Sequence, residues 1–147
     1  MLKGIHPLLH ADFLHALAAM GHGDELAIVD ANFPAASVAR RLIHASGASA
    51  PEALDAILTV FPLDTFLRPV ALTMQVVGNA SDVPEPVRDF TDVFARHGRG
   101  AIDLGSLERE AFYARARAAY AVVRTGDLRA YGNILLVKGV VNAYPPV

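Results

Sequence analysis

The chain has 147 residues, of which 53% are hydrophobic and 19% are charged, and we expect residues 1–147 to form a single folded domain. The net charge of −2, with no basic block, argues against a nucleic-acid partner. With no cysteine, disulfides, thiol nucleophiles and cysteine-based metal sites are excluded.

No apolar run is long enough to span a bilayer, and the first residues lack the continuous apolar stretch of a signal peptide. We therefore expect a soluble, cytoplasmic protein with no membrane partner. The mean hydropathy of +0.33 is high for a small domain and indicates apolar surface that other copies of the chain would cover.

Apolar periodicity, β-branched runs and Gly or Pro breaks define the predicted elements. In chain order they are a helix over 11–20, strands over 25–30 and 41–45, a helix over 51–61, a strand over 70–77, helices over 86–97 and 108–118, and strands over 120–124 and 134–137. The strand over 70–77 is the clearest and is expected to be central. This alternation predicts an α/β domain of three layers with a mainly parallel, mixed sheet, whose last strand follows a connection short enough to make it antiparallel.

His22 lies between Gly21 and Gly23 in the turn from the first predicted helix to the first predicted strand. Glycine on both sides removes bulk beside the imidazole, so a ligand can approach closely. The alternative is that Gly21 only ends the helix, Gly23 only makes the turn, and His22 is a surface residue. A dinucleotide motif is not indicated, because its glycines follow a strand and precede a helix.

Asp30 ends the first predicted strand, and ligands of open α/β sheets bind at the carboxyl ends of strands. If the preceding loop folds back over that edge, His22 and Asp30 face one cavity and form an acid/base pair. The alternative is that Asp30 only caps the following turn through its side chain.

Arg109 and Tyr113 are one helical turn apart and share a face, while Phe112 points toward the core. Arg109 could offer its fork of donors to ligand oxygens. The alternative is a solvated basic face shared with Arg115 and Arg117.

Tyr131, Gly132 and Asn133 precede the last predicted strand. A phenol and an amide offer both donors and acceptors to a polyhydroxylated ligand, although a plain turn would explain them equally. No metal site is expected, because the one metal-like histidine pair, His6 and His10, has a proline between its members.

Several separated motifs together resemble the D-ribose pyranase and L-fucose mutarotase family, and more closely its fucose branch. The matching segments are Met1-Leu2-Lys3, Met20-Gly21-His22-Gly23-Asp24-Glu25, Asp30-Ala31-Asn32-Phe33-Pro34-Ala35, Pro62-Leu63-Asp64-Thr65, Arg109 with Ala111-Phe112-Tyr113, Thr125-Gly126, Tyr131-Gly132-Asn133-Ile134-Leu135-Leu136 and Lys138-Gly139-Val140. Arg109 and Gly132 fit the fucose branch in particular.

The resemblance implies an isomerase that interconverts the anomers of L-fucose or a related free monosaccharide, with pyranose–furanose exchange as a further activity. His22 would be the proton donor. Asp30 and Tyr131 would assist as catalytic groups, and the sugar would contact Asp30, Arg109, Tyr131, Gly132 and Asn133. No cofactor is implied, and the expected assembly is a ring-shaped homo-oligomer, a decamer of two stacked five-membered rings with sites near subunit boundaries. The alternative function is a non-catalytic monosaccharide-binding module.

Overall fold

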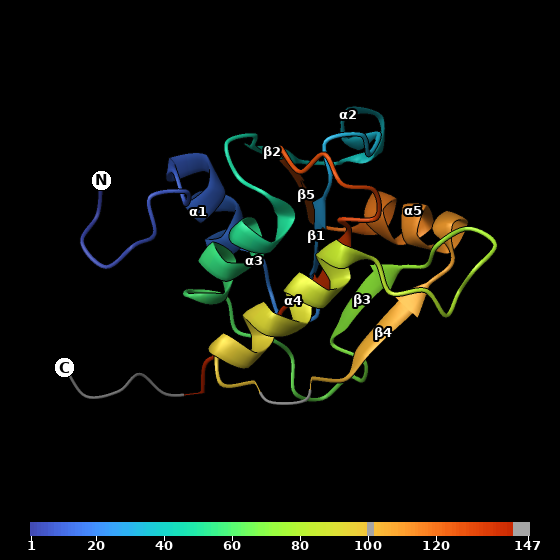
Figure 1. The fold of residues 1–147 in the computed structure, drawn as a ribbon. Coiled ribbons are helices and arrows are strands. Elements are labelled where there is room, and N and C mark those ends of the chain that lie inside the picture. The colour runs from blue at the N-terminus through green and yellow to red at the C-terminus, as the bar shows by residue number, and fades with distance from the viewer. Residues whose placement is uncertain (100–101, 143–147) are drawn as a thin grey trace.

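The computed structural model describes residues 1–99 and 102–142. Helices and strands alternate along the chain, except that two strands follow the last helix (Figure 1). They are α1 (Ala11–Ala19), β1 (Glu25–Val29), α2 (Ala35–Val38), β2 (Leu42–Ala45), α3 (Ala50–Leu58), β3 (Ala71–Met74), α4 (Glu85–Arg96), β4 (Leu104–Leu107), α5 (Arg109–Ala118), β5 (Ala121–Thr125) and β6 (Ile134–Val137).

Among the described residues, six strands form one mixed sheet in the order β2-β5-β1-β6-β3-β4. β2, β5 and β1 are parallel neighbours, β3 and β4 are parallel neighbours, and β6 runs antiparallel between β1 and β3. The predicted mixed α/β sheet and its antiparallel last strand are confirmed. Strands β1 to β5 therefore end at one edge of the sheet, the carboxyl edge, where β6 begins; the opposite edge is the amino edge.

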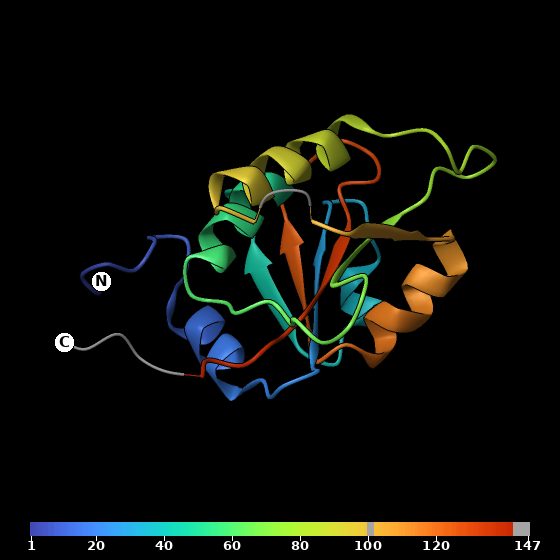
Figure 2. The ribbon, with the colours of Figure 1, turned by 90° about the horizontal axis from the view of Figure 1, so that it is seen from below.

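Helices cover both faces of this sheet, with α1, α3 and α4 on one side and α2 and α5 on the other (Figure 2). Successive side chains of a strand point to opposite faces, so β1 contributes Leu26 and Ile28 to the first core and Ala27 and Val29 to the second. Burial on both faces explains why this strand appears in the sequence as a continuous apolar run.

The predicted strand over 70–77 is wrong in its length and its position. β3 ends at Met74, and only the edge strand β4 lies beyond it, so the central strands are β1 and β6. The chain turns out of the sheet because Val76 and Asn79 pair across a tight turn in which Gly78 has a φ of 78°. The sequence also gave no prediction for β4 or α2, both of which have four residues.

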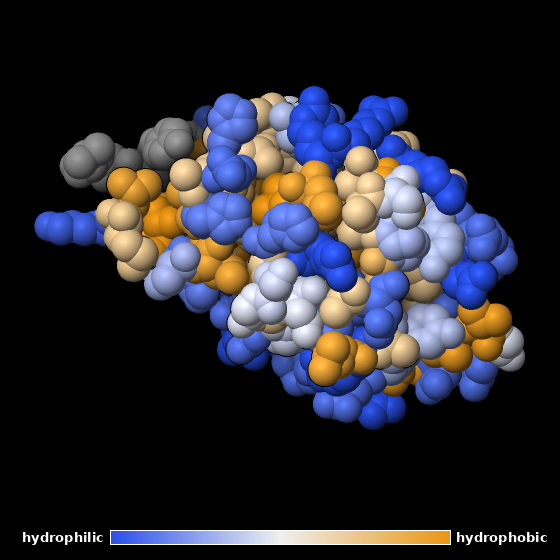
Figure 3. Space-filling model, turned by 90° about the horizontal axis from the view of Figure 1, so that it is seen from above, coloured by the Kyte–Doolittle hydropathy of each residue, from blue (hydrophilic) through white to orange (hydrophobic). Residues whose placement is uncertain are grey.

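Within residues 1–99 and 102–142, no helix has the length and apolar character needed to cross a membrane. The expected cytoplasmic location stays a prediction. Apolar side chains reach the surface in patches among hydrophilic ones (Figure 3). Phe66 and Leu128 are the most exposed large apolar side chains of the described residues after the first methionine, at 73% and 81%.

Candidate active site

A cavity of about 230 Å³ lies at the carboxyl edge of the sheet. Its walls come from the segment after β1, the end of β3, the first turn of α5 and the segment before β6. The lining residues are Asp30, Asn32, Phe33, Met74, Arg109, Tyr113, Ala130, Tyr131 and Asn133. The structure thus brings together four of the predicted site residues, namely Asp30, Arg109, Tyr131 and Asn133.

Asp30 follows the last residue of β1 and is only 5% exposed. Its Oδ1 accepts hydrogen bonds from the backbone N–H groups of Asn32, at 3.0 Å, and Phe33, at 2.9 Å. The predicted turn-capping role is therefore present together with the position in the cavity. Burial raises the pKa of Asp30 above its ordinary value, and the charge of nearby Asp127 acts in the same direction, although the turn hydrogen bonds oppose both.

Asn133 and Tyr131 are fixed by hydrogen bonds to separate segments. Asn133 Oδ1 accepts from the backbone N–H of Asp30 at 2.9 Å, which joins the start of β6 to the end of β1. The hydroxyl oxygen of Tyr131 accepts from the backbone N–H of Val77 at 3.1 Å. Tyr131 has a φ of 64°, a left-handed conformation that is uncommon for a tyrosine and is typical of functional sites. Gly132 is buried behind these side chains, where an added Cβ would lie 3.5 Å from that of Asp30.

Arg109 begins α5, and its side chain is half exposed at the mouth of the cavity. Its guanidinium carbon lies 5.8 Å from the ring centre of Tyr113, which confirms that these two residues share a face. The alternative of a purely solvated basic face does not describe this helix, because Arg115 instead forms a bidentate ion pair with Glu25. Phe112 is fully buried, as predicted.

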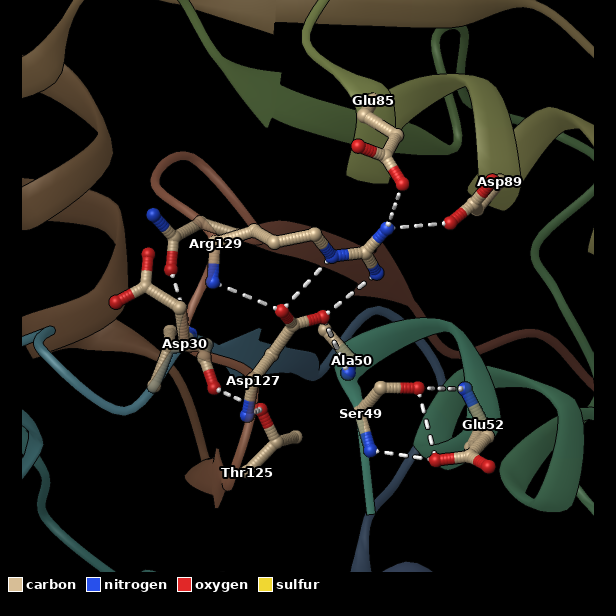
Figure 4. Close-up of polar contacts among 11 residues, drawn as sticks. Asp30, Ser49, Ala50, Glu52, Glu85, Asp89, Thr125, Asp127 and Arg129 are labelled. Carbon is tan, nitrogen blue, oxygen red and sulfur yellow. Dashed lines mark hydrogen bonds and ion pairs between the residues drawn. The ribbon is translucent and has the colours of Figure 1, made fainter.

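An ion-pair network supports the loop between β5 and β6 (Figure 4). Arg129 binds both carboxylate oxygens of Asp127, with Nε to Oδ1 at 3.0 Å and Nη2 to Oδ2 at 2.9 Å. Its Nη1 reaches Glu85 at 3.0 Å and Asp89 at 2.7 Å, both on α4. Asp127 also accepts from the backbone N–H of Ala50 at the start of α3, at 3.1 Å. Burial would raise the pKa of Asp127, but these donors outweigh it and lower the pKa.

His22 lies at the amino edge, away from this cavity. It precedes β1 whereas Asp30 follows β1, and five strand residues span roughly 16 Å. The expectation that the loop folds back so that His22 and Asp30 face one cavity is therefore wrong within a single chain. The carboxylate partner of His22 is instead Asp64, whose Oδ1 lies 3.1 Å from His22 Nε2.

Backbone hydrogen bonds hold the His22 turn at the amino edge, which is the physical reason for this correction. The N–H of Gly23 donates to the carbonyl of Lys138 at 2.8 Å, and the N–H of Lys138 donates to the carbonyl of Asp24 at 2.9 Å. Asp24 Oδ2 accepts from the N–H of Gly21 at 2.7 Å. The turn is thereby an extension of β6 pairing and cannot reach the carboxyl edge.

Lys138 also caps the helix before this turn. Gly21 follows α1 as expected, but the helix carbonyls are satisfied by Lys138 Nζ, which donates to Leu17 at 2.7 Å and to Met20 at 2.6 Å. A cation at a helix C-terminus interacts favourably with the helix dipole. The imidazole of His22 thus projects from a rigid turn, with 46% of its side chain exposed.

Sequence reasoning missed Asp64 and the Asp127–Arg129 pair as parts of the site. Asp64 is 42 residues from His22, and no periodicity links such distant positions. The available signal was Pro62-Leu63-Asp64-Thr65, which matched the family without an assigned role. In the chain outside residues 100, 101 and 143–147, no group of three or more potential metal-ligating His, Asp or Glu side chains occurs.

The comparisons with known proteins agree with this architecture. The model of the RbsD / FucU transport protein family matches residues 3–141. An L-fucose mutarotase of Glaesserella parasuis serovar 5 (strain SH0165) is 43% identical over 141 residues, which cover 95% of this chain and 96% of the relative. The fucose mutarotase of Homo sapiens is 40% identical over 149 residues, with 98% of this chain and 97% of the relative covered.

A crystal structure of the fucose mutarotase from Streptococcus pneumoniae in complex with L-fucose has a similar fold, with a TM-score of 0.89 and 41% identity. The match covers 95% of this chain and 99% of that one. The family match spans nearly the whole sequence, and the predicted resemblance is confirmed. The chain belongs to the RbsD / FucU family.

Proposed function

We propose that residues 1–147 form one domain that acts as a sugar mutarotase and interconverts the α and β anomers of L-fucose or a related free monosaccharide. The observation that carries this proposal is the small cavity in which a carboxylate, a guanidinium, a phenol and an amide converge from three segments of the chain. Such a mixture of donors and acceptors suits the hydroxyl groups of one sugar ring. The relatives named as L-fucose mutarotases, and the related structure that holds L-fucose, support this substrate class.

The reaction opens the sugar ring and closes it again after rotation about the bond between C1 and C2. One proton is delivered to the ring oxygen and one is removed from the anomeric hydroxyl, so a donor must face the first oxygen and an acceptor the second. A positioned acid or base contributes about 10² to 10⁴ in rate. Arg109 and Asn133 hold hydroxyls, whereas Asp30 and Tyr131 bind the sugar and assist proton transfer. Gly132 leaves room for it, and no cofactor takes part.

His22 is the main acid/base group, and it reaches the sugar from a second copy of the chain. Three observations support this arrangement: the imidazole is exposed, it lies at the edge opposite the cavity, and the apolar side chains of Phe66 and Leu67 stand exposed beside it. Leu128 is exposed in the loop next to the cavity and offers an apolar surface for that second copy. The assembly is a ring-shaped homo-oligomer, with a decamer of two five-membered rings as the expected form.

Saturation-transfer NMR on L-fucose, D-ribose and D-galactose tests the proposal. Saturating one anomeric proton should reduce the signal of the other when protein is added, most strongly for fucose, and His22→Ala should abolish the added exchange. Sugar binding without any added exchange would instead identify a non-catalytic binding module. Pyranose–furanose exchange is read from the same spectra, because the furanose anomeric protons of ribose resonate separately.

A further inference from the structure

Asp64 stands out because its carboxylate is buried at the amino edge, away from the residues that line the cavity of its own chain. Its side chain has no exposed surface, and it faces an imidazole that is 46% exposed. A buried carboxylate is costly unless it is fully hydrogen-bonded. The cavity therefore does not account for the burial of Asp64 next to His22.

The local chain holds this carboxylate in one orientation. Oδ1 accepts from the backbone N–H of Phe66 at 3.2 Å, and Oδ2 accepts from the N–H of Leu67 at 3.0 Å. The backbone N–H of Asp64 donates to the carbonyl of Val137, at the end of β6, at 3.0 Å. Each oxygen thus accepts one backbone hydrogen bond. Oδ1 can accept one more, and His22 Nε2 lies in position to donate it.

We infer that Asp64 is a positioning residue that keeps the proton of His22 on Nε2 and so makes Nδ1 the nitrogen that exchanges protons with the sugar. This inference rests on the proposed role of His22 as the acid/base group. An ionised carboxylate can only accept hydrogen bonds, so the Nε2 that faces it must carry the hydrogen. In the neutral ring, Nδ1 then carries the free lone pair and acts as the base. In the protonated ring, the N–H group at Nδ1 is the acid.

The surroundings of His22 agree with this division of the two nitrogens. Burial acts to raise the pKa of Asp64, but the hydrogen bonds from His22 and from the two backbone N–H groups outweigh it, and the pKa is lowered. The other charged groups at this turn are engaged elsewhere, since Asp24 binds the N–H of Gly21 and Lys138 caps α1. Phe66 packs on the imidazole with ring centres 5.6 Å apart and limits its rotation.

The tautomer can be measured on the unaltered protein, without any activity assay. Long-range ¹H–¹⁵N correlation spectra of ¹⁵N-labelled protein distinguish the two neutral tautomers of each histidine, and the His22 signals are those missing from His22→Gln. We expect the neutral imidazole of His22 to be the Nε2–H tautomer. An Nδ1–H tautomer would overturn the inference.

Asp64→Asn tests the consequence for catalysis. The amide cannot satisfy the two N–H groups and the imidazole together, and it carries no charge to stabilise the imidazolium. We expect kcat to fall about 10- to 100-fold with KM little changed, which is less than complete loss of an acid/base group. We also expect the pH–rate profile to differ from that of the unaltered protein, because the imidazole no longer faces a carboxylate. A purely structural role would leave that profile in place.

Asp55→Asn is the matched control, since Asp55 also accepts from an imidazole Nε2, that of His97, at 2.8 Å, but between α3 and α4. It should leave the rate and the pH profile unchanged. If His22→Ala is inactive while Asp64→Asn keeps full kcat and the normal profile, the inference fails and the proposed function stands. If the unaltered protein adds no sugar exchange while the Nε2–H tautomer is observed, the proposed function fails instead. Full exchange in His22→Ala would remove the acid/base role of His22 on which the inference rests.

Discussion

Asp30 is a residue whose placement in the cavity opposes the stability of the fold. The pKa of Asp30 is higher in the folded chain than in the unfolded chain because the carboxyl is buried. Its contribution to the free energy of unfolding is therefore largest at low pH and declines as the pH rises through the folded-state pKa. Asp127 and Asp64 behave in the opposite way, because their pKa values are lowered and the stability they contribute is lost as the pH falls.

Asp30→Asn should therefore stabilise the protein at pH 7 and inactivate it. The amide oxygen can still accept from Asn32 and Phe33, while the buried charge is removed. We expect a higher Tm at pH 7, a smaller difference near pH 4, and sugar exchange reduced by about 10²-fold or more. Thermal unfolding between pH 4 and 8 measures this. Asp127→Asn is the control with the opposite sign, since it weakens the pair with Arg129; equal Tm changes in both variants would contradict the argument.

Among the elements, β6 runs from the carboxyl edge to the amino edge. Just after its end at the amino edge, Gly139 lies close to the backbone of Leu63 and Asp64. A Cβ on Gly139 would overlap the carbonyl oxygen of Leu63 and would lie 2.6 Å from its carbonyl carbon and 2.8 Å from the nitrogen of Asp64. No side chain fits there without moving the segment that carries Asp64. The glycine after β6 thus sets the position of the carboxylate that faces His22.

Gly139→Ala should destabilise the protein by about 1–3 kcal/mol through overpacking. It should also lower kcat, because the displaced Asp64 no longer orients the imidazole. Urea unfolding and NMR exchange rates measure the two effects. Gly47→Ala provides the control, since an added Cβ there meets nothing within 4 Å. A fully stable and fully active Gly139→Ala would contradict the placement of this segment.

Elements with a strong local signal could be predicted from the sequence, and those that depend on partners could not. β6 and the helices α1, α3, α4 and α5 agree with their predictions to within a few residues, because apolar spacing and breakers define them. β4 contains a glycine and a serine among its four residues and is a strand because it pairs with β3. The same limit applies to the site. Asp30, Tyr131 and Asn133 flank strands that meet at one edge, so their convergence could be expected, whereas the His22–Asp64 contact arises only from the folded backbone.

At the scale of the whole molecule, placing His22 and Asp30 at opposite edges predicts complementation between inactive variants. His22→Ala and Asp30→Asn should each be inactive alone. When the two chains are co-expressed, a chain with an intact His22 can face a chain with an intact cavity. Random assembly at a 1:1 ratio should restore about one quarter of the wild-type activity, because each interface needs the correct chain on both sides.

Exchange rates of the purified mixed assembly measure this recovery, with light scattering to show its mass. Assemblies made from one variant alone, either His22→Ala or Asp30→Asn, provide the control. Failure to recover any activity from assemblies proven to contain both chains would contradict a site shared between copies.

With a site shared between copies, as proposed, the length of β1 also predicts that the rate of sugar exchange depends on protein concentration. Once the protein is diluted below the dissociation constant of its assembly, every chain keeps an imidazole at one end and a sugar cavity at the other, with nothing to bring them together. The rate per chain should then fall steadily on dilution while circular dichroism still reports folded protein. A rate per chain that stays constant down to a demonstrated monomer would show that each copy works alone.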